Sequence, residues 1–317
     1  MTQEVIDEKY MHRCIQLARN GLQNAKPNPM VGAVLVSEGR IIGEGWHVRC
    51  GEGHAEVNCF ASVRPSDEAL LPLSTLYVSL EPCSHYGRTP PCADLIIRKR
   101  VPRVVVGCID PFAEVQGRGI RKLRDAGVEV TVGVLEEECR RLNKAFFTFH
   151  TYHRPFILLK WAQTANGFIG LLPTVQREGN SALQLSNAFS RMLVHKLRAE
   201  FDAILVGRIT DEREHPQLNV RHWSGPDPLR IVLSHDTDIA SVLQRLYEER
   251  CQSLLVEGGR ITLQSFIDQG LWDEIRVETA PFAVSDGVRA PLLPSGIQVS
   301  GREEYDGNVI IHYERNS

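Results

Sequence analysis

Three residues in the first half of the chain have side chains suited to a transition metal, and they occur in two short motifs. His54 stands two residues before Glu56, and Cys83 ends the sequence Glu81-Pro82-Cys83, with Cys92 following further along. One imidazole and two thiolates form a borderline-soft donor set that suits zinc. Three protein ligands leave a fourth position for water, which is the arrangement of a catalytic site.

The carboxylate of Glu56 is the natural general acid and base for such a site. It can take a proton from the attacking water and pass it to a leaving amine. The order His-x-Glu, Pro-Cys, Cys is the signature of zinc-dependent deaminases. The alternatives are a structural zinc site or no metal, but a structural site is normally closed by a fourth Cys or His, and none stands at a matching spacing.

The elements that must position these residues alternate between strands and helices. An opening helix is expected from Asp7, its proposed N-cap, to Asn20, and a β-hairpin is expected from the apolar runs 31–36 and 41–46. The predicted helices that follow cover residues 54–63, 91–99, 119–126 and 136–149, and the predicted strands cover 75–79, 103–107 and 128–134. Both metal-binding motifs therefore lie at strand-to-helix junctions of an α/β domain.

The pattern restarts near residues 150–155, so we expect two domains, 1–150 and 151–317. The second half is also α/β. Its predicted strands cover residues 156–161, 203–207, 229–234, 253–257, 274–279 and 308–312, and its predicted helices cover 187–200 and 261–269. Residues 172–181 and 211–228 are expected to be loops.

Composition narrows the class of protein. The 317 residues include 43% hydrophobic and 24% charged residues, and no apolar run approaches the roughly 18 residues of a membrane helix. The polar, acidic N-terminus does not resemble a secretory signal, so we expect a cytoplasmic protein without a membrane partner. The net charge of −3 provides no overall positive field to attract the phosphate backbone of nucleic acid, so we do not expect a nucleic-acid partner.

The cysteines other than Cys83 and Cys92 are interpreted as core or bystander thiols rather than disulfides. They are Cys14, Cys50, Cys59, Cys108, Cys139 and Cys251.

The spacing of the two metal-binding cysteines points to one deaminase family. Eight residues separate Cys83 from Cys92, whereas nucleoside and tRNA deaminases have two. The segment Glu81-Pro82-Cys83-Ser84-His85-Tyr86-Gly87-Arg88-Thr89-Pro90-Pro91-Cys92 resembles the deaminase half of the bifunctional riboflavin-biosynthesis deaminase/reductase family. The motifs Pro27-Asn28-Pro29-x-Val31-Gly32 and Gly43-x-Gly45-x-His47 are similar to the same family. The resemblance implies a cytidine-deaminase-like α/β/α sandwich over about residues 7–150.

The resemblance also implies roles for four further residues of this half. Asn28 and His47 would bind the pyrimidine and its sugar, while Arg88 and Thr89 would hold the substrate phosphate. A guanidinium beside a hydroxyl is a suitable phosphate clamp, and an amide between two prolines is stiffly presented. Taken without the family, Asn28 would be a turn residue and Arg88 a solvated charge.

The second half resembles the reductase half of the same family, which implies a dihydrofolate-reductase-like α/β domain. The resemblance is carried by residues 160–167, 197–210, 216–221 and 256–259. It implies that the substrate is held by Arg198, Leu218, Arg221 and Glu257, with the arginines near its phosphate, and that NADPH is bound by Ala162, Thr210, Gly258 and Gly259. The sixteen residues from His235 to Arg250 form a shorter connection than is usual in the family.

The leading hypothesis is a bifunctional enzyme that uses Zn²⁺ and NADPH as cofactors and acts on one small-molecule substrate. It would deaminate a phosphoribosyl-aminopyrimidine and then reduce its ribosyl chain. One alternative is a deaminase whose second domain is a non-catalytic dimerisation module, and another is a deaminase of RNA bases, which the acidic charge balance disfavours. We expect a homo-oligomer.

Overall fold

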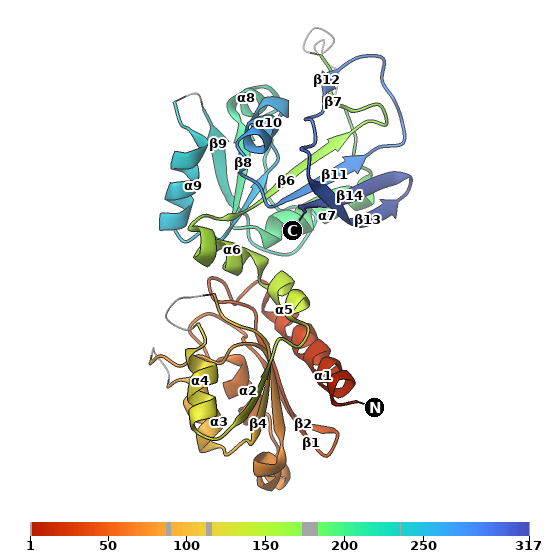
Figure 1. The fold of residues 1–317 in the computed structure, drawn as a ribbon. Helices are drawn as coiled ribbons and strands as arrows, with labels where there is room; N and C mark the ends of the chain where they lie inside the picture. The colour runs from red at the N-terminus through yellow and green to blue at the C-terminus, as the bar shows by residue number, and fades with distance from the viewer. Residues whose placement is uncertain (1, 87–89, 112–115, 173–182, 235, 317) are drawn as a thin grey trace. The chain divides into compact units, whose positions relative to one another are not determined.

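The computed structural model describes residues 2–86, 90–111, 116–172, 183–234 and 236–316 (Figure 1). The chain divides into two compact units, residues 1–152 and 153–317. Among the described residues, no helix has the length and apolar character needed to cross a membrane. Each unit is built on its own sheet, so each is described separately.

The sheet of the first unit has the strand order β2-β1-β3-β4-β5. Its strands are β1 (Gly32–Ser37), β2 (Arg40–Trp46), β3 (Thr75–Leu80), β4 (Arg103–Cys108) and β5 (Glu129–Val132). The first two form the expected hairpin, closed by Glu38 and Gly39, which both have positive φ as a tight two-residue turn requires. The strands β3, β4 and β5 run parallel, so their carboxyl ends share one edge.

Helices cover both faces of this sheet (Figure 1). The first face carries α1 (Gln3–Ala18), α5 (Glu136–Leu142) and α6 (Lys144–Tyr152), and the second carries α2 (Ala55–Ala61), α3 (Cys92–Arg98) and α4 (Arg118–Asp125). Two 3₁₀ segments, Arg19–Gly21 and Pro65–Leu73, complete the unit. The α/β/α sandwich predicted from the sequence is confirmed.

Two details of the first unit differ from the sequence prediction. The N-cap of α1 is Thr2 rather than Asp7, because Asp7 lies inside the helix with its carboxylate turned toward the sheet. The segment predicted as one helix over 136–149 is two helices separated at Asn143. In both cases a polar side chain makes a distant contact that short-range periodicity does not reveal.

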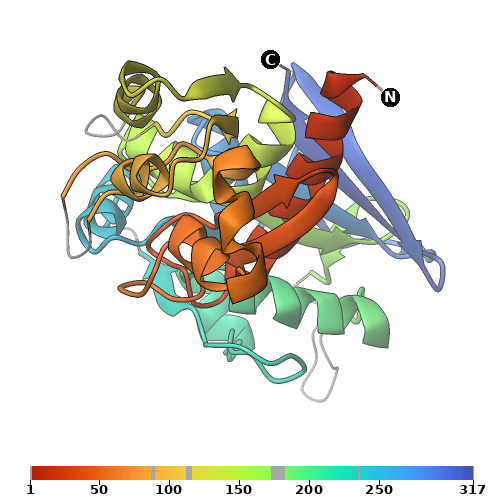
Figure 2. The ribbon, with the colours of Figure 1, turned by 90° about the horizontal axis from the view of Figure 1, so that it is seen from below.

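The sheet of the second unit has the order β13-β14-β11-β6-β10-β8-β9. Its strands are β6 (Phe156–Gln163), β8 (Ala203–Gly207), β9 (Leu229–Leu233), β10 (Ser253–Val256), β11 (Glu274–Thr279), β13 (Ile297–Tyr305) and β14 (Asn308–Arg315). Five of these strands are parallel, and β13 and β14 add an antiparallel edge, the violet two-stranded ribbon of Figure 2. A small separate sheet pairs β7 (Phe168–Gly170) with β12 (Val288–Arg289).

The helices of this unit are α7 (Ala188–Glu200), α8 (Arg208–Glu214), α9 (Ile239–Glu248) and α10 (Arg260–Asp268). The apolar sides of α9 and α10 pack into one core with alternate residues of the parallel strands. The short connection noted in the sequence is thus spanned by α9. The helices α8 and α9 and the strands β7, β12 and β13 were not among the predicted elements.

The position of Asp7 generates a prediction about stability. Its carboxylate accepts two hydrogen bonds from the guanidinium of Arg103, at 3.0 and 2.7 Å, and one from the hydroxyl of Tyr77, at 2.9 Å. Burial raises the pKa of Asp7, but hydrogen bonds from Arg103, Gln3 and Tyr77 outweigh it, so the pKa is lowered. We expect Asp7→Asn to lower the free energy of unfolding by about 3 kcal/mol at pH 7, because Arg103 loses its charge partner.

The sign of the pH dependence follows from the lowered pKa. The stabilisation by Asp7 is present above the unfolded-state pKa of about 4 and is lost as pH falls through the folded-state value. Urea unfolding of both proteins from pH 7 to pH 3 should therefore show their difference shrinking. Asp67→Asn, which breaks the solvent-exposed pair with Arg40, is the matched control and should change stability little. An equal effect of the two substitutions would contradict the assignment.

Candidate functional site

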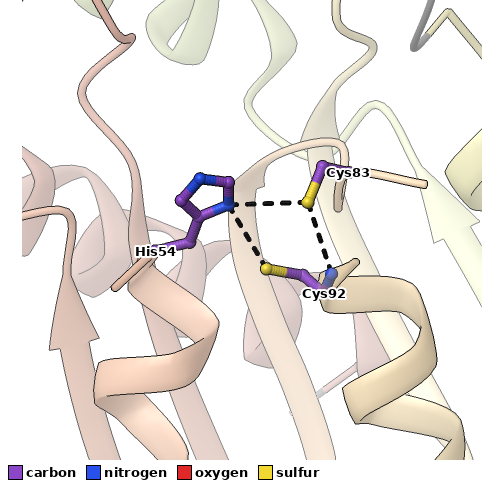
Figure 3. Close-up of side chains that lie close together, drawn as sticks. All are labelled: His54, Cys83 and Cys92. Carbon is purple, nitrogen blue, oxygen red and sulfur yellow. Dashed lines mark hydrogen bonds between the residues drawn. The ribbon is translucent and has the colours of Figure 1, made fainter. Parts of the chain in front are cut away.

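Three donor atoms converge in the first unit. The Nδ1 atom of His54 lies 3.5 Å from the sulfur of Cys83 and 3.4 Å from the sulfur of Cys92 (Figure 3). A tetrahedral zinc ion with ordinary Zn–N and Zn–S bonds requires N···S separations of about 3.6 Å. Among the described residues, these three form the one group of His, Cys, Asp and Glu side chains able to hold a metal ion. Donor type and spacing both fit zinc.

The backbone around the cluster explains how it is held. His54 is the N-cap of α2, Cys83 follows β3, and Cys92 is the first residue of α3. The backbone N–H of Cys92 donates to the sulfur of Cys83 at 3.3 Å. Such a contact from a helix start stabilises the thiolate form of cysteine.

Glycines in β2 set the position of α2. A Cβ at Gly45 would lie 2.3 Å from the backbone nitrogen of Cys59, and one at Gly43 would lie 2.7 Å from the Cys59 carbonyl oxygen. Only glycine allows the helix to approach the strand so closely. The glycines of the Gly43-x-Gly45-x-His47 motif therefore place the helix that carries both His54 and Glu56.

Glu56 is almost fully buried, with 4% of its surface exposed. Burial and the nearby Cys83 thiolate raise the pKa of Glu56 to about 7, while His54 acts in the opposite direction. A carboxyl group whose pKa is near neutrality can both accept and release a proton during turnover. This is the property required of a proton shuttle.

The ligand side chains influence one another strongly. A hydrogen bond with Cys83 raises the pKa of His54 to about 9. Hydrogen bonds from Cys92 and His54 lower the pKa of Cys83 to about 4, whereas the bond to Cys83 and burial raise the pKa of Cys92. Zinc requires a neutral imidazole and two thiolates, so binding releases protons from this cluster.

The structure brings two of the four predicted recognition residues to the same place. The ring of His47 lies edge-on to that of His54, with centroids 5.5 Å apart, and its Nε2 is 3.1 Å from the amide nitrogen of Asn28. The Nδ1 of His47 contacts the Gly53 carbonyl oxygen at 3.1 Å and is therefore the protonated nitrogen. Burial lowers the pKa of His47, which favours this neutral form. Arg88 and Thr89 lie outside the described residues.

Glu81 has a role that the sequence analysis did not assign. Its buried carboxylate accepts hydrogen bonds from the backbone N–H groups of Gly117, Gly119 and Ile120, at 2.9, 2.9 and 3.2 Å. A Cβ at Gly119 would lie 1.9 Å from the carbonyl oxygen of Pro82. The start of α4 is thus fastened to the residue pair that precedes Cys83. The glutamate directly before Pro-Cys was the available signal.

The second unit gathers charged residues at the carboxyl edge of its sheet. The guanidinium of Arg198 in α7 pairs with the carboxylate of Glu257, which follows β10, with a shortest N···O distance of 2.8 Å. The same guanidinium donates to the carbonyl oxygen of Asn219 at 3.3 Å, and Arg221 donates to the Asn219 side chain at 3.1 Å. Both arginines therefore meet at the loop that contains Leu218, which is buried and has positive φ.

Lys160 is a second residue that the sequence analysis did not assign. It lies on β6, opposite Arg276 of β11. Burial lowers the pKa of Lys160, although the carboxylates of Glu257 and Glu278 oppose this effect. A lysine inside an otherwise apolar strand was the available signal, because a cation there requires a carboxylate partner.

The residues predicted to bind the cofactor come together at the same edge. Thr210 Oγ1 accepts a hydrogen bond from the backbone N–H of Gly259 at 3.1 Å, and Gly259 is the N-cap of α10. A Cβ at Gly258 would lie 2.9 Å from Thr262, so this turn requires a small residue. Ala162 lies near the carboxyl end of β6, which is the neighbour of β10. Ligands of parallel α/β sheets bind at this edge.

Comparisons with known proteins cover both units. The cytidine and deoxycytidylate deaminase zinc-binding region matches residues 4–108, and the RibD C-terminal domain matches residues 155–239 and 236–302. The riboflavin biosynthesis protein RibD of Aquifex aeolicus is 37% identical over 327 residues, with 89% of each chain covered. RibD of Escherichia coli is 31% identical, with 92% of each chain covered.

A solved structure agrees over the whole length. The crystal structure of a diaminohydroxyphosphoribosylaminopyrimidine deaminase/5-amino-6-(5-phosphoribosylamino)uracil reductase from Thermotoga maritima has a TM-score of 0.89 and 32% sequence identity. The match covers 99% of this chain and 100% of that chain. With a zinc-binding deaminase unit followed by an NADPH-using reductase unit, the chain belongs to the RibD family of bifunctional riboflavin-biosynthesis enzymes.

Proposed function

We propose that the first unit hydrolytically deaminates a diaminopyrimidine that carries a phosphoribosylamino group, with zinc held by His54, Cys83 and Cys92. The observation that carries this proposal is the convergence of an imidazole and two thiols beside the buried carboxyl of Glu56. The substrate is the one named for the Thermotoga maritima relative. Bound zinc supplies a Lewis acid that lowers the pKa of a water molecule.

In this reaction Glu56 moves the protons. Its carboxylate accepts one from the water that attacks the amino-bearing ring carbon, and the resulting acid donates it to the nitrogen as the C–N bond breaks and ammonia leaves. The pKa of about 7 suits both steps. The buried position keeps bulk water from replacing this group.

Recognition of the substrate falls to residues around this centre. With its amide nitrogen against His47, the oxygen of Asn28 is available to accept a hydrogen bond from the pyrimidine or its sugar. Arg88 and Thr89 would hold the phosphate, as a cation and hydroxyl pair.

For the second unit we propose reduction of the ribosyl chain of the deaminated product. Ala162, Thr210, Gly258 and Gly259 would bind NADPH, which supplies a hydride. Glu257 would face the ribose, and Arg221 with Arg198 would lie near the phosphate. Leu218 would contact the substrate, and Lys160 beside Glu257 would donate a hydrogen bond to a ribose oxygen.

We also propose that the enzyme is a cytoplasmic homo-oligomer. A reducing compartment suits the two ligand thiols, which must be reduced to bind zinc, and the cysteines of the described residues form no disulfides.

The first prediction concerns the metal. The purified protein should hold about one zinc per chain, and Cys83→Ser or Cys92→Ser should remove it, because two remaining donors are too few for a stable site. Metal analysis by atomic emission measures this. Cys50→Ser, at an exposed cysteine outside the cluster, is the control and should keep the zinc. Wild-type protein purified without chelators that holds no zinc would refute the assignment.

The second prediction concerns the proton shuttle. Glu56→Gln should retain the zinc yet lower kcat for deamination by about 10²- to 10⁴-fold, because an amide cannot carry the proton. Ammonia release under saturating substrate measures the rate, and metal analysis of the same sample verifies the site. Turnover close to that of the wild type would rule out this role.

The third prediction concerns the reductase. Arg221→Ala should raise KM for the phosphorylated substrate by about tenfold or more, since a charge-assisted contact contributes about 1.5–3 kcal/mol. Deamination should be unchanged. Arg208→Ala, which removes an exposed arginine paired with Glu212, is the control. Substrate-dependent oxidation of NADPH is the assay, and its complete absence in the wild type would favour the non-catalytic dimerisation module.

A further inference from the structure

The side chain of Asn143 makes a long-range contact inside the first unit. Asn143 separates α5 from α6, where the sequence pattern predicts a continuous helix. Its amide oxygen accepts a hydrogen bond from the backbone N–H of Met30, and its amide nitrogen donates to the Met30 carbonyl oxygen, both at 2.8 Å. Asn143 is 4% exposed, so these bonds replace water for both groups.

Met30 belongs to the segment that presents Asn28. In this segment Pro27 and Pro29 have no backbone N–H, and the N–H of Asn28 donates to the Ala25 carbonyl oxygen at 2.9 Å. The backbone N–H of His47 donates to the Val31 carbonyl oxygen, also at 2.9 Å. The Met30 peptide groups lie between these two anchors.

The N–H of Gly32 donates to the Ser79 hydroxyl at 3.1 Å, which fixes the far end of the segment. At Met30 itself, the side chain of Asn143 hydrogen-bonds to both the backbone N–H and the backbone carbonyl oxygen. An amide is the side chain that offers a donor and an acceptor in the planar arrangement of a peptide group, as a strand partner would. Asn143 thus completes the fastening of this segment just before β1 begins at Gly32.

We propose that Asn143 is a positioning residue for the deaminase, which holds the 28–31 segment so that Asn28 and His47 face the zinc centre. This inference rests on the proposed role of Asn28 and His47 in binding the substrate. Both ends of the segment contact the two proposed substrate-binding residues. Asn28 itself lies at one end, and Val31, at the other end, accepts a hydrogen bond from the backbone N–H of His47. Asn143 itself does not reach the substrate.

The test is steady-state deamination by Asn143→Ala, with metal content and thermal stability measured on the same preparation. Released from Asn143, the segment samples other conformations, so kcat/KM should fall by about tenfold or more, mainly through KM. The zinc content should remain that of the wild type. The reductase, assayed with the deaminated substrate, should be unchanged.

Asn143→Asp adds a second test, the pH dependence of KM. A residue that only stabilises the fold would not give the dependence described here. The carboxylate still accepts from the Met30 N–H, but it faces the Met30 carbonyl oxygen without a proton to donate. When the acid is protonated, the second bond is restored. The ratio of the variant's KM to the wild-type KM should therefore fall as pH is lowered from 8 to 6.

Two further variants separate the possible outcomes. Ser74→Ala removes a buried hydrogen bond to the Leu71 carbonyl oxygen elsewhere in the unit and should lower stability without changing KM. Asn28→Ala should raise KM as Asn143→Ala does, and the double variant should be less impaired than the product of the two effects. If Asn28→Ala raises KM but Asn143→Ala does not, the positioning role is wrong. If Asn28→Ala leaves KM unchanged, the proposed recognition role fails, and the inference fails with it.

Discussion

The first unit is organised around a partly buried cluster of three metal-ligand side chains that needs positive charge. The Nδ1 atom of His54 lies within 3.5 Å of both sulfur atoms. When both thiols are ionised, the two thiolates repel each other unless a cation lies between them. In the metal-free cluster, the raised pKa of Cys92 favours a neutral thiol, and the raised pKa of His54 favours a protonated imidazole beside the Cys83 thiolate. Zinc replaces the proton with a divalent ion, so the fold holds the donors ready for binding.

Keeping three donors in place requires rigid attachment of each one. Gly45 lets α2 lie against β2, which places His54 and Glu56. The carboxylate of Glu81 fastens the start of α4 to the backbone before Cys83. Glycine loses more conformational freedom on folding than other residues, so the close approach of α2 to β2 has an entropic cost. The burial of the Glu81 carboxylate also has a cost, which its hydrogen bonds from backbone N–H groups offset. Neither the glycines nor Glu81 need to touch the substrate.

Short-range patterns were sufficient to predict much of the fold. The strand-helix alternation, the hairpin and the metal-binding motifs depend on neighbouring residues, and all were visible in the sequence. The helix α8 was missed because none of its residues is buried, so it has no apolar stripe. By contrast, α9 carries Ile239, Val242, Leu243 and Leu246 at helical spacing, so the sequence does contain the signal for this helix.

Long-range polar contacts account for what the sequence could not predict. The sequence pattern predicts Asp7 as a helix N-cap, but its partner in the fold, Arg103, is 96 positions away. The bonds from Asn143 to Met30 span 113 positions. The periodicity of neighbouring residues cannot predict these long-range contacts, because each depends on how the sheet folds. Candidate ligands defined by a motif were therefore easier to find than the residues that hold them.

Charge balance distinguishes the two predicted phosphate contacts of the second unit. Arg198 is paired through two hydrogen bonds with Glu257, and both side chains are largely buried, so most of its charge is already offset. Arg221 is exposed, and its guanidinium donates to the side-chain amide oxygens of Gln217 and Asn219, which carry no net charge. An incoming phosphate dianion therefore gains more from Arg221 than from Arg198, whose release would leave Glu257 buried without its partner. On this basis we propose that Arg198 chiefly orients Glu257 and the Asn219 loop, and that Arg221 would provide the charge that attracts the phosphate.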